Sequence, residues 1–247
     1  MRFLAIFMLA FSLLAARPVA AEELTPQLDD LVRHFGQVLF GSEYGFQEHT
    51  PGVISKWNAG TTVGITVQGR QTEKLVHMAA KHVRGLAKLT GLKFKTVAVG
   101  TPGPTIDLIF MKRAEMAGLA KQLPPTEAEL VRAMTRDPTM VCFFLVWHKP
   151  PERIVKSIVA VNVERDPVMI DACLLEELTQ VMGLPNDVDA YWPTMFKPVD
   201  TSLEWSKWDR LYIKTLYDPR IKPGMKPVDA LYVAKDIFAK ALAEHAK

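Results

Sequence analysis

Apolar residues recur at two spacings along the chain, and the change from one to the other predicts the order of helices and strands. Helical spacing covers residues 25–40 and 72–90, and Gly91 is a stop signal for the second helix. Runs of β-branched and apolar residues between turn signals predict strands at 55–68, 93–99, 105–111, 140–147 and 154–163. The last two strands are expected to form a hairpin, and short helices are expected between them and the earlier strands, at 113–123 and 126–135.

A further helix is predicted from Asp166, which suits an N-cap and is followed by Pro167, to Met182, before the stop residue Gly183. Residues 227–245 repeat apolar positions on one helical face. The pattern predicts an α+β fold in which a twisted mixed sheet is covered by two long helices. Helical segments are expected at both ends, over 22–52 and 226–247, around a main domain at 53–225.

The first 21 residues have the pattern of an export signal. Arg2 precedes an apolar run from Phe3 to Ala16, and small residues up to Ala21 provide a cleavage site. The run is short for a membrane span. We therefore expect a periplasmic or secreted protein without a stable span after cleavage near Ala21.

Charge changes this picture little. The net charge is +3, and removing Arg2 and Arg17 with the signal leaves 28 basic against 27 acidic residues. A nucleic-acid partner would require a strongly basic face. We therefore predict no nucleic-acid binding.

The chain has two cysteines, Cys142 in a predicted strand and Cys173 in the predicted helix from Asp166. In an oxidising compartment an even pair favours a disulfide, with two buried thiols as the alternative. Cys142 has apolar neighbours, which raise rather than lower a thiol pKa and disfavour a nucleophile.

The chemistry of the chain is concentrated in EELTQVMGLPND, residues 176–187. Its spacing matches the zinc-peptidase pattern H-E-x-x-H-x-x-G-x-x-H, in which three histidines bind the metal and the glutamate is the general base. Here Glu176, Gln180 and Asn186 occupy the ligand positions, while Glu177 and Gly183 are retained. The spacing is present without the histidine ligands.

This segment, together with residues 192–196, 202–211 and 216–225, resembles an uncharacterised family of exported bacterial proteins, a domain of unknown function with a metzincin-like metallopeptidase fold. The resemblance covers roughly 53–225. It implies that Phe196, with Met195 beside it, lies at the Met-turn position, and that 202–217 is the last helix of that fold.

Amide oxygens are poor zinc ligands, so we predict no zinc cofactor and no metal centre. A hard cation such as calcium stays open as an alternative, because oxygen donors of the kind it prefers cluster here. A hydrogen-bonded network in place of the metal is the other reading. The candidate binding residues are Glu176, Gln180, Asn186, Asp187 and His148, and the candidate catalytic residue is Glu177; Asp189 would be a further cation ligand.

The leading hypothesis is a non-catalytic pseudo-peptidase that binds a polypeptide or an envelope partner in a protease-type cleft. The cleft edge would be the hairpin strand near Cys142 to His148, which would add the bound segment as a further strand. Two alternatives remain: a hydrolase that uses Glu177 as general base with a nonstandard metal, and an envelope structural protein. The tryptophans at 205 and 208, three residues apart, are expected to pack in the core.

Overall fold

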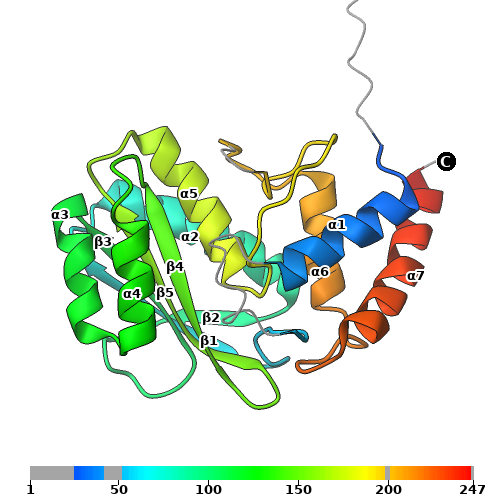
Figure 1. Ribbon diagram of the computed structural model, residues 1–247, viewed down its shortest axis with the longest axis horizontal. Helices are drawn as coiled ribbons and strands as arrows, with labels where there is room; N and C mark the ends of the chain where they lie inside the picture. Colours follow the sequence, from blue (N-terminus) through cyan, green and yellow to red (C-terminus); the bar gives the residue numbers. More distant parts are fainter. Residues whose placement is uncertain (1–24, 42–51, 198–200, 246–247) are drawn as a thin grey trace, which may run out of the picture.

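A computed structural model describes residues 25–41, 52–197 and 201–245 (Figure 1). The expected signal segment, 1–21, lies outside the described residues. The described part of the chain contains one five-stranded sheet and seven α-helices. The mixed sheet and helices agree with the expected α+β class.

The sheet is parallel except at one edge. Its strand order is β2-β1-β3-β5-β4, formed by β1 (Thr62–Gly69), β2 (Lys93–Thr96), β3 (Thr105–Met111), β4 (Cys142–Lys149) and β5 (Arg153–Asn162). β4 pairs only with β5, in antiparallel orientation, as the predicted hairpin requires. The sheet therefore has two edge strands, β2 and β4, and β4 is the longer one and the one expected to accept an added segment.

Helices cover both faces of the sheet. α2 (Glu73–Thr90) and α5 (Pro167–Gln180) pack together over one face, against alternate strand residues such as Ile106, Leu108 and Val159. α3 (Arg113–Met116), the 3₁₀ helix η2 (Ala117–Gln122) and α4 (Pro125–Met134) pack on the other face against Phe143 and Ala160. The period-two alternation of the strands produces these two separate apolar clusters.

The helices at the two ends of the described chain lie side by side, which Figure 1 shows at the side opposite α3 and α4. α1 (Leu28–Phe40) packs on α7 (Pro227–His245), and α6 (Lys207–Leu216) lies next to both. Phe35 contacts Phe238 edge to face and also contacts Tyr212 of α6. The helices α1, α6 and α7 therefore contribute to the same buried core as the sheet.

Two expected boundaries were wrong. The strand expected at 55–68 begins only at Thr62, because the Lys56 and Trp57 side chains turn into the core and Lys56 makes a single bridge to Arg153. The helix expected at 202–217 begins at Lys207, where Ser206 accepts the backbone N–H of Asp209 as N-cap. None of the described helices is both long and apolar enough to cross a membrane.

Candidate functional site

Helix α5 carries the EExxQ segment along the sheet. Asp166 caps its N-terminus by accepting the Val168 N–H, and Pro167 is the first helical residue. The helix is buried on almost all sides, because it packs on α2, β4 and β5. A polar residue on this helix, such as Glu177 at 4% exposure, is therefore placed inside the protein.

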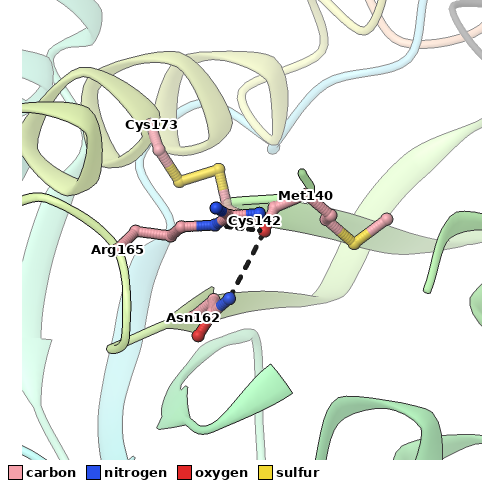
Figure 2. The surroundings of a disulfide bond; sticks show 5 residues. All are labelled: Met140, Cys142, Asn162, Arg165 and Cys173. Atoms are coloured by element: carbon pink, nitrogen blue, oxygen red, sulfur yellow. Dashed lines mark hydrogen bonds between the residues drawn. A yellow bond between two sulfur atoms is a disulfide. The ribbon is translucent and has the colours of Figure 1, made fainter. Parts of the chain in front are cut away.

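A disulfide joins β4 to α5. Cys142 and Cys173 form the expected bond, with their Cα atoms 6.2 Å apart (Figure 2). Beside it, the Met140 carbonyl accepts hydrogen bonds from Asn162 Nδ2 at 3.4 Å and Arg165 Nε at 3.2 Å. The start of β4 is thus attached to α5 by the disulfide, and Met140 just before it is attached to the end of β5 and to Arg165.

Glu177 lies one helical turn after Cys173, against this disulfide. A carboxylate oxygen of Glu177 and the two sulfur atoms lie within 4.8 Å of one another. Among the described residues this is the one cluster of three potential metal-ligating side chains. Because both sulfurs are bonded to each other, neither is available as a thiolate ligand.

The turn after α5 is fixed by groups from distant segments. The Gln180 carbonyl accepts the N–H groups of Gly183 and Leu184. The Trp57 indole N–H donates to the Val181 carbonyl at 2.8 Å, and the Tyr217 hydroxyl donates to the Met182 carbonyl at 2.9 Å. These bonds satisfy carbonyls that the end of a helix leaves without an intrahelical partner.

Gly183 is required at this turn for two reasons. Its φ is +109°, a conformation that residues with a Cβ rarely adopt. A Cβ at this position would also lie 2.0 Å from the carbonyl oxygen of Ser55. The glycine of the peptidase-like spacing therefore serves a close backbone contact here.

Two of the three predicted ligand positions, Gln180 and Asn186, have defined hydrogen-bond partners. Gln180 Nε2 donates to Asp187 Oδ1 at 3.3 Å, so two of the predicted binding residues meet. Asn186 Nδ2 instead donates to the Gln37 carbonyl in the last turn of α1, at 3.0 Å. The Asn186 side chain also packs against Gly41, where a Cβ would lie 2.2 Å from its amide nitrogen. Asn186 therefore links the turn to α1.

His148 lies at the far end of β4 from the disulfide. The strand β4 continues through Lys149, with a register shift between Trp147 and His148. The His148 side chain is half-buried, and this burial lowers the pKa of His148, with an opposing effect from Glu152. His148 is therefore mainly neutral at pH 7.

Two other histidines are engaged elsewhere. His34 is fully buried between Trp192 and Tyr212, where burial lowers its pKa to about 4. His82 Nε2 lies 2.6 Å from Asp171 Oδ1, which joins α2 to α5. Each has a structural partner, and neither belongs to the turn after α5.

The sequence did not reveal the buried lysine at position 56. Lys56 Nζ donates to the Leu216 carbonyl at the end of α6 at 2.6 Å and lies 5.0 Å from the centre of the Tyr217 ring. Burial lowers the pKa of Lys56 to about 8. Lysines are mostly exposed, and the sequence around Lys56 gives no sign that this one is buried. Its burial follows only from its tertiary contacts.

The segment after the turn is held by a second buried carboxylate. Asp209 accepts hydrogen bonds from Thr194 Oγ1 at 2.5 Å and from the backbone N–H groups of Met195 and Ser206. Burial raises the pKa of Asp209, and these hydrogen bonds oppose that effect. The residues expected at the Met-turn position, Met195 and Phe196, are both buried in the main core.

The tryptophans near this segment pack as expected. Trp208 is buried, and the Trp205 indole N–H donates to Thr179 Oγ1 at 2.8 Å, which connects the start of α6 to α5. Trp205 therefore links the segment before α6 to both α5 and α2.

Comparison with known proteins identifies the family. The family described as "Protein of unknown function (DUF2927)" matches residues 29–235, most of the chain. The chain belongs to this family. No curated protein matches it. The DUF2927 region includes all of α1 except Leu28 and the first part of α7, as far as residue 235, so both terminal helices contribute to the family region.

Proposed function

We propose that this DUF2927 protein is a non-catalytic relative of the metzincin peptidases that binds an extended polypeptide along β4. The observation that carries the proposal is the position of β4, an antiparallel edge strand with one neighbour among the described residues. An edge strand presents a row of backbone donors and acceptors to which another chain can add.

The register of β4 identifies which backbone groups face outward. The Asn162 N–H donates to the Val141 carbonyl at 2.8 Å, so this pair is a hydrogen-bonded one. In an antiparallel ladder such pairs alternate with pairs whose N–H and C=O groups point away from each other. Val146, paired with Ser157, falls in the outward-pointing set. Its N–H and C=O are available to an added strand.

The surroundings of β4 suit a binding groove rather than a mobile edge. The disulfide fixes one end of β4 to α5, and His148 lies at the other end. A rigid edge has little conformational entropy of its own to lose when a peptide binds.

The relation to metzincins rests on element order and spacing. A mostly parallel sheet ends in an antiparallel edge strand and is followed by a helix that carries EExxQxxGxxN. Gly183 forms the turn, and a buried segment with Met195 and Phe196 follows. These are the features that supported the resemblance in the sequence.

We infer the absence of catalysis from the contacts and burial of the side chains at the peptidase-like positions. Asn186 directs its amide nitrogen to α1, and Glu177 is buried against a disulfide. A general base has to reach a water or substrate proton within hydrogen-bond distance. In these positions the side chains maintain the fold, and the proposed binding function rests on the edge strand β4 alone.

We infer export to the periplasm or beyond from residues 1–21. The Cys142–Cys173 bond agrees with this, since disulfides persist mainly in oxidising compartments. The polypeptide partner would then be a secreted or envelope protein.

The test is capture of a random-sequence decapeptide library by the wild-type protein and two variants. Val146→Pro removes one outward N–H from β4 and leaves the bonds to β5 intact. Val146→Thr keeps this N–H and is the matched control. We expect at least tenfold weaker capture by Val146→Pro alone, with melting temperatures of both variants close to that of wild type. Equal capture by the two variants would exclude β4 as the docking edge.

A further inference from the structure

A separate cavity lies at the carboxyl ends of β1 and β3. Its volume is about 460 Å³, and it is lined by Gly69, Arg70, Phe110, Met111, Glu115, Gly118, Leu119 and Gln122. Pockets that hold small molecules typically have volumes of about 300–1,000 Å³. None of these residues belongs to β4, α5 or the turn after α5, so this is a second place in the molecule.

The connections that follow β1 and β3 explain why the cavity lies at the ends of these two strands. The chain leaves β1 for α2, which packs on one face of the sheet, and leaves β3 for α3, which packs on the other. Adjacent parallel strands whose connections diverge to opposite faces leave a crevice at their carboxyl ends. In this protein the crevice lies between Gly69 and Met111, and the cavity occupies it.

The cavity contains one positive and one negative side chain in fixed positions. Arg70 Nη2 donates to Glu115 Oε1 at 2.5 Å, and Arg70 Nε donates to Glu115 Oε2 at 3.1 Å. The Lys112 N–H donates to the same Oε2 at 2.8 Å. These bonds lower the pKa of Glu115 to about 2, chiefly through Arg70. The pair is therefore fully ionised at neutral pH.

Neither charged group is saturated by the other. A guanidinium has five N–H donors, and Glu115 uses two of those of Arg70. Each carboxylate oxygen accepts two bonds, so Glu115 Oε1 has capacity for a second donor. Both side chains are about half-exposed, with relative exposures of 52% and 43%. A ligand can therefore contact both charges without breaking the ion pair.

The remaining walls are apolar or neutral. Phe110, Met111 and Leu119 form an apolar surface, and the amide of Gln122 lies at the side. A purely anionic ligand would meet the Glu115 charge, and a purely cationic one would meet Arg70. A small zwitterion with an apolar side chain matches all these groups.

We propose that this cavity is a binding site for a free amino acid or dipeptide with an apolar side chain. Its carboxylate would accept N–H groups of Arg70, its ammonium would donate to Glu115 Oε1, and its side chain would cover Met111 and Leu119. The site is independent of the β4 groove, so failure of either proposal leaves the other standing.

Gly118 allows a direct test. A Cβ at Gly118 meets no atom within 4 Å, and its backbone is not in the left-handed region, so a larger side chain fits without strain. Gly118→Leu therefore places a side chain in the cavity and leaves Arg70 and Glu115 in position. Glu115→Gln removes the negative charge and serves as the second variant if Gly118→Leu lowers the melting temperature.

The experiment is an NMR titration of the full chain with L-leucine and two analogues. The first analogue, 4-methylpentanoate, lacks the amino group, and the second, 3-methylbutylamine, lacks the carboxyl group. We expect saturable leucine binding that is at least tenfold weaker for both analogues. Gly118→Leu and Glu115→Gln should each weaken leucine binding at least tenfold. No saturable leucine binding, equal binding of an analogue, or unchanged binding in both variants would overturn the proposal.

Discussion

Gly183 is the residue on which the turn after α5 depends, because both its φ and the closeness of Ser55 exclude a side chain. We expect Gly183→Ala to lower the free energy of unfolding by roughly 3 kcal/mol or more. Gly91→Ala is the control, since Gly91 also has a positive φ, +71°, but has open space around it. That change should cost about 1 kcal/mol. Urea unfolding measures both, and equal losses would show that the contact with Ser55 is unimportant.

His34 predicts a pH dependence of stability at the same scale. Its ordinary pKa of 6.5 is lowered to about 4 by burial in the folded protein. Between these values only the unfolded chain takes up a proton at His34, so stability falls as the pH drops from 6.5 to 4. The loss from this residue is at most about 3 kcal/mol.

His34→Phe is the matched variant, because it keeps an aromatic ring between Trp192 and Tyr212. Denaturant unfolding of both proteins at several pH values should show a shallower acid decline for the variant. His82 and the carboxylates titrate in both proteins and cancel in the comparison. The same decline in both proteins would refute the role of His34.

The link between β4 and α5 determines stability at the element scale. The disulfide closes a loop of 31 residues, which corresponds to about 3–4 kcal/mol by chain entropy. We expect the double variant Cys142→Ala, Cys173→Ala to lose about this much in thermal or denaturant unfolding. Each single variant should lose nearly as much, because either one removes the whole bond. Additive losses from the two single variants would contradict this.

Some helices and strands could be predicted from the sequence, and some of their contacts could not. Strong periodicity predicted α2, α5 and the β4–β5 hairpin close to their observed bounds, because those patterns are local. The partner of Asn186 was not predictable, because Gln37 is 149 residues away and contributes a backbone carbonyl. Lys56 was hidden for the same reason. The spacing of the EExxQ segment predicted the turn at Gly183. The hydrogen-bond partners of its side chains could be found only from the three-dimensional structure.

At the scale of the whole molecule, the terminal helices are part of the central core. We expect Phe238→Ala on α7 to cost about 3–5 kcal/mol, since Phe238 is fully buried against Phe35 and Tyr212. Tyr232→Ala on the same helix is the control, because Tyr232 is 81% exposed. It should change stability by less than about 0.5 kcal/mol. Calorimetry should show one transition for wild type, and a separate early transition confined to Phe238→Ala would show that α7 folds independently.

The central claim is that the β4 edge binds polypeptides and does not cleave them. The most direct measurement is mass spectrometry of a random decapeptide library incubated with the protein in the presence of zinc and calcium. The account predicts that retained peptides are intact, that no new termini appear, and that retention falls in Val146→Pro. New termini that disappear in Glu177→Gln would contradict it and identify the protein as a hydrolase.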